Sequence, residues 1–148
     1  MIRVDASEQV RSFERLREKL KEGALRILDE TAKNTAQWVK HTTKFKSRTG
    51  ELLKSVRASR PSTFHRFVVA GAKHAGWVEN GTRPHPIAAK NGKFLRFQQN
   101  GSWRYARRVM HPGTKPAHFM KEVADKMRPL FAQAMKRMID AAVAGASW

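Results

Sequence analysis

The distribution of charge along this 148-residue chain constrains its folding more than any other feature of the sequence. Residues 31–121 carry nineteen basic side chains and only two acidic ones, Glu51 and Glu79. Residues 1–30 hold seven of each sign, and residues 122–148 hold four basic and three acidic side chains. Because so one-sided a segment repels itself, charge opposes its compact state. We therefore expect the middle of the chain to face an anionic partner, namely DNA, RNA or an acidic protein surface.

Length and composition indicate one ordinary globular domain over residues 1–148. A chain of this size can bury one modest core, and it is 41% hydrophobic and 28% charged. The absence of cysteine excludes disulfides, thiolate nucleophiles and cysteine-bound zinc. No apolar run reaches the roughly 18 residues of a membrane span, and residues 1–5 lack the apolar core of a signal peptide. Synthesis in the cytoplasm follows as the default.

Apolar residues at helical spacing predict a long helix at the start of the chain. Asp5 and Glu8 form a capping-box pattern, with Ser7 as a rival cap. The helix is expected to run to about Val39, with Gly23 tolerated inside it. One apolar stripe follows from the spacing, and it consists of Phe13, Leu16, Leu20, Ala24, Ile27, Thr31 and Trp38.

A second helix is predicted from about Ala117 to the neighbourhood of Gly145. Pro129 lies inside its apolar pattern, so a kink or break is expected around residues 126–128. Its methionines are interpreted as core residues. The stripe consists of Phe119, Val123, Met127, Leu130, Phe131, Ala134, Met138 and Ala141.

Shorter elements are expected between these helices. Thr49 can cap a short helix that runs to about Ala58 and ends before Pro61. Residues 63–71 read as a strand with apolar side chains on both faces, which favours a central position in a sheet. Two further runs, residues 94–98 and 102–109, predict a hairpin around Gln99-Asn100-Gly101.

The register of this hairpin depends on the length of its loop. A two-residue turn at Asn100 and Gly101 would pair Phe97 with Arg104 and separate the apolar faces. A three-residue loop with Gly101 left-handed would pair Phe97 with Trp103. Since a one-residue slip turns every side chain to the other face, the apolar pattern favours the three-residue loop.

The expected fold class is therefore α+β. It comprises a long N-terminal helix, a small antiparallel sheet of three to four strands with a hairpin, and a C-terminal helix packed on the sheet.

Residue types that perform catalysis are scarce in the middle of the chain. Glu51 and Glu79 are its only carboxylates, so a pair for acid–base chemistry is lacking. No histidine pair has helical i, i+4 spacing with an acid nearby. No G-x-S-x-G elbow or glycine-rich phosphate loop occurs. We expect no enzyme activity, metal, cofactor or small-molecule substrate. The six histidines are His41, His65, His74, His85, His111 and His118.

Two segments carry a recognisable pattern. The first is AGWVENGTRPH at residues 75–85, followed by Ile87 and then Leu95-Arg96-Phe97. The second is VMHPGTKPAHFM at residues 109–120, which opens the final helix. In their order and spacing they resemble the tail-completion, or head–tail joining, family of long-tailed bacteriophages. In that family an aromatic, a Glu and a Gly-Thr follow the first strand, and a His-Pro-Gly-Thr precedes the last helix.

The resemblance spans most of the chain, including the first helix and the helix start at residues 49–53. The chain departs from it at Ala117-His118-Phe119, where the family often has a proline directly before the aromatic. This departure bears on where the last helix begins.

The resemblance implies a structural role in the virion. It predicts a ring, expected as a hexamer, at the head-proximal end of the tail, assembled in the host cytoplasm and retained in the phage neck. The implied partners are further copies of the chain, the tail terminator, the connector and the phage DNA end, with no membrane. The motif residues implied as subunit contacts are Trp77, Glu79, Gly81, Thr82, His111, Gly113, Thr114 and Phe119.

Physical reasoning about the same residues adds two expectations. Gly81 and Gly113 permit tight turns beside Thr82 and Thr114, whose hydroxyls can close them. Glu79 is interpreted as a structural ion pair or, alternatively, as a contact to the next subunit. The basic loops expected to face DNA or an acidic partner carry Lys44, Lys46, Arg48, Arg83, Lys90 and Lys93.

The alternative function is a basic nucleic-acid-binding protein that acts outside a virion. Trp77, Phe97, Trp103 and Tyr105 could stack on bases. No recognised reader motif accompanies them, and the aromatic residues are more simply explained as the core of the hairpin.

Overall fold

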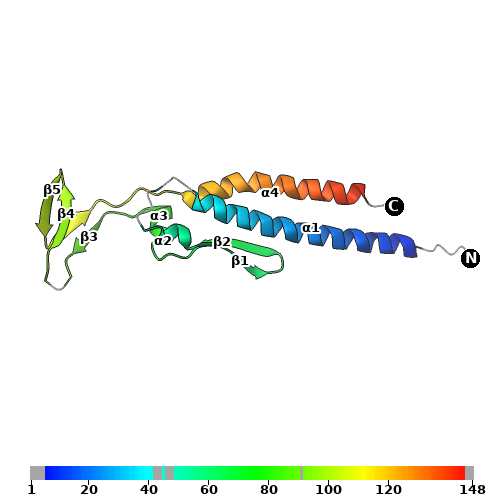
Figure 1. Ribbon diagram of the computed structural model, residues 1–148, viewed down its shortest axis with the longest axis horizontal. Helices are drawn as coiled ribbons and strands as arrows, with labels where there is room; N and C mark the ends of the chain where they lie inside the picture. Colours follow the sequence, from blue (N-terminus) through cyan, green and yellow to red (C-terminus); the bar gives the residue numbers. More distant parts are fainter. Residues whose placement is uncertain (1–5, 42–44, 46–48, 91, 146–148) are drawn as a thin grey trace, which may run out of the picture. The chain divides into compact units, whose positions relative to one another are not determined.

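The computed structural model describes residues 6–41, 45, 49–90 and 92–145. The chain divides into two compact units: the helical unit, Met1–Ala72 with Phe119–Trp148, and the strand unit, Lys73–His118. The expected organisation as one domain stays a prediction. In chain order (Figure 1) the elements are α1 (Ser7–Lys40), α2 (Glu51–Lys54), β1 (Val56–Ser62), β2 (His65–Ala70), α3 (Ala75–Asn80), β3 (His85–Ala88), β4 (Leu95–Gln99), β5 (Ser102–Ala106), β6 (Arg108–His111) and α4 (Phe119–Ala144).

The α+β class is confirmed, but the predicted single sheet is wrong. In the described ranges the strands form three separate two-stranded antiparallel ladders, β1–β2, β3–β6 and β4–β5. Like charges on neighbouring strands destabilise a sheet. In a segment with nineteen cations and two acids, charge repulsion between neighbouring strands is therefore smaller in narrow ladders than in a wide sheet. No helix in these ranges is long and apolar enough to span a bilayer.

The predicted first helix is confirmed, since α1 ends one residue beyond the expected Val39. Ala6 occupies the cap position, so Ser7 is the first helical residue and not the cap, while Asp5 lies outside the described residues. The buried face is richer in small residues than the predicted stripe, and Phe13 and Trp38 of that stripe are exposed. It consists of Gly23, Ile27, Ala32, Ala36 and Val39.

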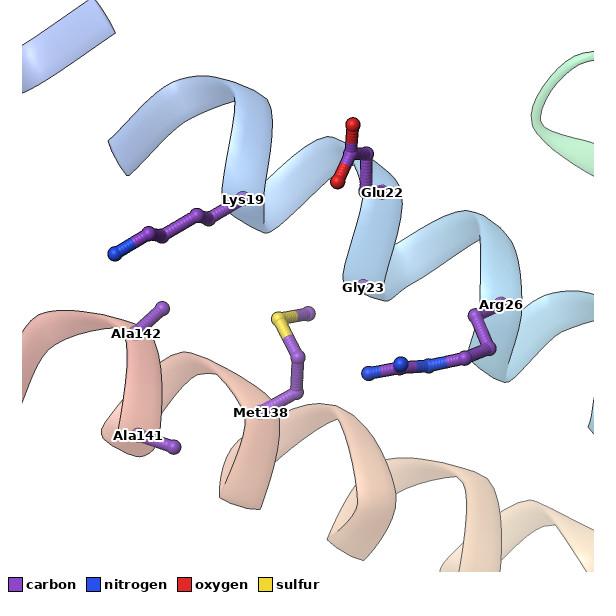
Figure 2. Close-up of a pocket in the computed structure, with 7 residues that line it drawn as sticks. All are labelled: Lys19, Glu22, Gly23, Arg26, Met138, Ala141 and Ala142. Carbon is purple, nitrogen blue, oxygen red and sulfur yellow. The ribbon is translucent and has the colours of Figure 1, made fainter. Parts of the chain in front are cut away.

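Helix α4 packs along α1, so its predicted packing on a sheet is wrong. Phe119, Val123 and Met127 are buried in this unit. Gly23 of α1 allows the close approach, since a Cβ there would lie 2.7 Å from Met138 Cγ. Figure 2 shows the Met138 side chain directed from α4 towards Gly23.

The predicted boundaries of α4 need correction at two places. The helix begins at Phe119 and not at Ala117, because the backbone of His118 has a φ of 50° and cannot be helical. The helix also continues through Pro129, so the break is wrong, while the kink that was its alternative stays a prediction. Pro129 is exposed, and water can therefore satisfy the carbonyl left without its helical donor.

The predicted helix from Thr49 to Ala58 is shorter than expected. Helix α2 ends at Lys54, and Val56 already pairs with Ala70 in the β1–β2 hairpin. Ser55 terminates the helix because its carbonyl and hydroxyl accept the backbone N–H groups of Gly71 and Ala72, at 3.3 and 3.0 Å. The hydroxyl of Thr49 accepts from the backbone N–H of Glu51 at 3.3 Å, but Gly50 occupies the cap position of α2, so the predicted cap at Thr49 is wrong.

The central position expected for strand β2 is wrong, because β1 is its partner in a two-stranded ladder. One face of β2 is half-buried where β1–β2 packs on α1. On the other face Phe67 is 57% exposed and Val69 is 39% exposed. Within the described residues only one face of the strand is partly buried, although both faces carry apolar residues.

A buried arginine holds the β1–β2 hairpin to α1. The Arg66 side chain is only 5% exposed, and its Nε donates to the Asp29 carboxylate of α1. The two N–H bonds of its Nη1 are shared among the carbonyl oxygens of Ser62, Thr63 and His65, at 2.9–3.0 Å. One guanidinium thus satisfies the backbone of the hairpin turn and fixes that turn on the first helix.

The β4–β5 hairpin lies where it was predicted, but the predicted register is wrong. Phe97 pairs with Arg104 and not with Trp103. The turn consists of Asn100 and Gly101 alone, both with positive φ, at 51° and 77°. Positive φ at both positions is typical of a type I′ turn, whose twist matches that of the flanking strands. The Asn-Gly turn therefore outweighs the pairing of apolar side chains on which the prediction relies.

We predict that Asp29→Asn lowers the melting temperature at neutral pH and that this effect disappears in acid. The hydrogen bond from Arg66 holds the pKa of Asp29 below its usual range, and the nearby positive charges of Arg66, Arg60 and Lys33 act in the same direction against the opposing effect of burial. A carboxylate whose folded pKa is lowered stabilises above the unfolded pKa of about 4, and loses that contribution as the pH falls through the folded value. Thermal melts of both proteins across this range test it. Glu30→Gln on the same helix is the control and should change little.

We predict that Gly23→Leu destabilises the helical unit by about 1–3 kcal/mol, the usual cost of overpacking a close contact. The added side chain would meet Met138, so Met138→Ala in the same protein should restore part of the loss. Asn34→Leu introduces leucine at an exposed position of α1 and should change stability by less than about 0.5 kcal/mol. Chemical denaturation followed by circular dichroism measures all three, and equal effects of Gly23→Leu and Asn34→Leu would contradict the role of Gly23.

Candidate functional site

The two sequence motifs meet in the strand unit through a reciprocal backbone bridge. The Thr82 N–H donates to the Thr114 carbonyl at 3.0 Å, and the Thr114 N–H donates to the Thr82 carbonyl at 3.1 Å. The Thr114 N–H also lies 3.0 Å from Thr82 Oγ1, and the two hydroxyl oxygens are 3.1 Å apart. The two Gly-Thr dipeptides, separated along the chain by about thirty residues, therefore face each other. We call the joined segments, residues 78–85 and 109–118, the clasp.

Glycine is required on both sides of the clasp. Gly81 and Gly113 have φ values of 71° and 87°, a region that side chains rarely adopt. A Cβ on Gly81 would overlap the Thr114 carbonyl oxygen, and a Cβ on Gly113 would overlap the Thr82 carbonyl oxygen. The sequence predicts tight turns at these glycines. The structure adds that each glycine admits the backbone of the opposite segment.

The second motif also donates hydrogen bonds to carbonyl groups at the C-terminal end of α3. The Ala117 N–H donates to the Val78 carbonyl at 2.9 Å, and the His118 N–H donates to the Glu79 carbonyl at 3.1 Å. These carbonyls belong to the last turn of α3, where a helix has no internal donors to offer. Glu79 therefore contributes to the clasp through its backbone. Both interpretations of its half-buried side chain stay predictions.

Beyond the bridge, the clasp continues into the β3–β6 ladder. His85 and His111 are paired in register, and their rings stack with centroids 5.1 Å apart. His85 Nδ1 donates to the Arg83 carbonyl at 2.9 Å, while His111 Nδ1 accepts from the Gly113 N–H at 3.0 Å. Hydrogen bonds to the local backbone thus orient both rings. His111 therefore lies in the predicted site, and His85, which ends the first motif, joins it although it was not among the predicted contact residues.

The remaining predicted motif residues lie apart from the bridge. Trp77, on α3, is 64% exposed and available to a partner. Phe119 is 1% exposed and packs edge to face on Phe45, with ring centroids 5.1 Å apart, in the helical unit. Burial gives Phe119 a place in the core of that unit.

The basic loops are placed only in part. Arg83, Lys90 and Lys93 are exposed, and the Lys93 N–H donates to the Lys90 carbonyl in a turn, at 3.3 Å. Lys44, Lys46 and Arg48 lie outside the described residues. Among the described residues no group of three or more side chains could hold a metal ion. The expected absence of catalysis, metal and cofactor stays a prediction.

Sequence reasoning placed the aromatic residues of the hairpin in a core, and the structure contradicts this. Trp103 is 54% exposed and Tyr105 is 64% exposed. The register puts both on one face of β4–β5 with Arg96, whose guanidinium carbon lies 3.9 Å from the centre of the Trp103 ring. We call this surface, composed of Arg96, Gln98, Trp103 and Tyr105, the hairpin face. The signal that could have revealed it is the Asn100-Gly101 turn, because that turn fixes the register.

The strand unit combines high charge with little burial. Its 46 residues carry nine basic side chains and one acidic side chain. Of the buried apolar side chains among the described residues, ten lie in the helical unit and only Ala75 lies in the strand unit. Backbone hydrogen bonds, not a core of its own, therefore hold the strand unit together.

We predict that Gly113→Ala opens the clasp whereas Gly92→Ala leaves it closed. Gly92 also has a positive φ, at 67°, but a Cβ there would meet nothing within 4 Å. Both variants carry the backbone cost of about 1–2 kcal/mol for a left-handed residue, and only Gly113→Ala adds a collision. In hydrogen exchange, the amides of Thr82 and Thr114 should exchange about tenfold faster in Gly113→Ala than in Gly92→Ala, as expected for roughly 1.4 kcal/mol. Equal exchange would contradict the close approach.

Comparison with known proteins yields no match to any protein-family model, to any curated protein or to any solved structure.

Proposed function

We propose that the chain is a structural virion protein of a long-tailed bacteriophage, which joins tail to head as a ring at the head-proximal end of the tail. The observation that carries this proposal is the clasp. The two motifs on which the resemblance rests are the two halves of one hydrogen-bonded arrangement, linked through Thr82 and Thr114. If the likeness of the two short segments to the family were due to chance, they would not be expected to meet in the fold. Their hydrogen-bonded contact therefore supports a shared structural role.

The scarcity of buried side chains in the strand unit supports a role among partners. Isolated two-stranded ladders are marginally stable in water, and the described residues of this unit form two of them with one buried apolar side chain. Several large apolar side chains of this unit are also left exposed and are available to partners. Those of its described residues that are at least 54% exposed are Trp77, Phe94, Trp103, Tyr105 and Met110.

Charge suggests which partners the ring meets. Further copies of the chain, the tail terminator and the connector are the expected neighbours, and a basic surface favours acidic faces on them or the phage DNA end. The exposed loop cations Arg83, Lys90 and Lys93 are available for such contacts. Attraction of this kind is screened by salt, so docking of the ring should weaken as ionic strength rises.

An early stop codon in this gene tests the proposal. Negative-stain electron microscopy of a lysate from the parent phage should reveal filled heads beside complete, unattached tails. Supplying the wild-type protein from a plasmid should restore joined particles. Intact, infectious particles in the absence of the protein would refute the structural role and would leave the nucleic-acid-binding function as the alternative.

A matched pair of variants in the same complementation assay tests the site. We predict that Trp77→Ala fails to restore joining, because this exposed ring adjoins the clasp on α3. Trp38→Ala removes a comparably exposed tryptophan from α1, 49% exposed, and should restore joined particles. Circular dichroism verifies that both variants fold. Equal complementation by the two variants would remove Trp77 from the proposed interface.

A further inference from the structure

The hairpin face presents two aromatic rings to solvent. Trp103 and Tyr105 are two residues apart on β5 and therefore point to the same side of the ladder. Their cross-strand partners on that side are Gln98 and Arg96. The half-buried side chains Leu95, Phe97 and Ala106 occupy the opposite side. The rings are thus directed to the more exposed side of the hairpin.

A cation lies close to one of these rings, and a second cation–π contact lies just outside the two strands. The Arg96 guanidinium lies over Trp103, at 3.9 Å from the ring centre, and the Arg107 guanidinium lies 5.6 Å from the centre of Phe94. Such cation–π contacts hold an arginine in place while leaving its outer N–H groups free for an anion. The hairpin face therefore combines positioned positive charge with exposed π surface.

The charge of this segment specifies an anionic partner. Residues 93–108 contain five basic side chains and no acidic one. An acidic protein surface would pair with these cations and could also bury the two rings, and the polyglutamate measurement below distinguishes it. Nucleic acid uses both, because phosphates pair with the cations and every base offers a flat face for stacking. In a duplex the base faces are already stacked on each other, so the rings favour an unpaired strand.

We propose that the hairpin face of β4–β5 binds single-stranded nucleic acid, with Trp103 and Tyr105 stacking on bases and Arg96 contacting the backbone. This proposal does not depend on the head–tail joining role. The electron microscopy experiment above can fail while the binding surface stands, and the reverse also holds.

Fluorescence anisotropy of the full chain with a short labelled oligothymidylate tests the proposal. Replacing both rings, Trp103→Ala with Tyr105→Ala, should weaken binding by about tenfold or more, as expected for the loss of base stacking. The matched control is Phe67→Ala, which removes a comparably exposed aromatic, 57%, from the other hairpin. This control should leave the affinity unchanged. An unchanged affinity of the double variant would overturn the proposal.

Salt dependence separates stacking from charge. Changing Arg96→Gln should reduce the slope of log affinity against log salt concentration by about 0.7 for one lost phosphate contact on a single strand. The double aromatic variant should keep the wild-type slope while its affinity falls. A double variant that loses slope and affinity together would indicate that the rings only position cations, which would overturn the stacking role.

Three further measurements distinguish base stacking from contacts made by charge alone. Trp103→Phe with Tyr105→Phe keeps both rings and should retain most of the affinity, so an equal loss in the phenylalanine and alanine variants would overturn the proposal. A duplex of the same length should bind more weakly, and equally tight binding would indicate phosphate contacts alone. Polyglutamate should displace the labelled strand poorly. Displacement as efficient as that by unlabelled oligothymidylate would assign the surface to an acidic protein.

Discussion

The strand unit depends on the close approach of two backbones at Gly81 and Gly113. Each glycine admits the carbonyl oxygen of the threonine beside the other glycine, so the bridge between Thr82 and Thr114 forms only if neither position carries a side chain. Two consequences extend outward from this bridge. In one direction it aligns β3 with β6, which brings His85 onto His111. In the other direction it positions the N–H groups of Ala117 and His118 to donate to the carbonyls of the last turn of α3. A short helix and a four-residue ladder, each marginal alone, thus share one fixed contact.

The helical unit is stabilised in a different way. Helix α1 packs on α4 through a face rich in small residues, and Gly23 makes room for the side chain of Met138. The β1–β2 hairpin is added through Arg66, whose guanidinium serves both the hairpin turn and Asp29. Most of the buried apolar side chains lie in this unit. It can therefore rely on the hydrophobic effect, whereas the strand unit relies on backbone hydrogen bonds that are only modestly favourable in water.

The parts of the fold that local periodicity determines could be predicted from the sequence. Both long helices follow from apolar spacing, and only a local feature, the left-handed backbone of His118, displaces a boundary by two residues. The hairpin is located correctly, but its register is not, because the apolar pattern received more weight than the Asn100-Gly101 turn. The clasp joins residues 32 apart in sequence. Its glycines and threonines could be named from the motifs, but nothing in one sequence reveals that the two motifs pair, and for that reason His85 was not predicted to contact His111.

Charge repulsion opposes the compact state of the middle segment, and the open architecture of the strand unit reduces this repulsion. A two-stranded ladder leaves both edges and at least one face accessible, so the cations of the strand unit stay hydrated and their mutual repulsion remains screened. The same openness leaves Trp103, Tyr105 and Trp77 in water, where a globular unit would bury them. The hydrated cations and the exposed rings therefore both follow from the scarcity of buried side chains among the described residues of this unit. An anionic partner that covers the hairpin face would relieve the repulsion and bury the rings in a single step, which is why the binding surface is expected there and not on the helical unit.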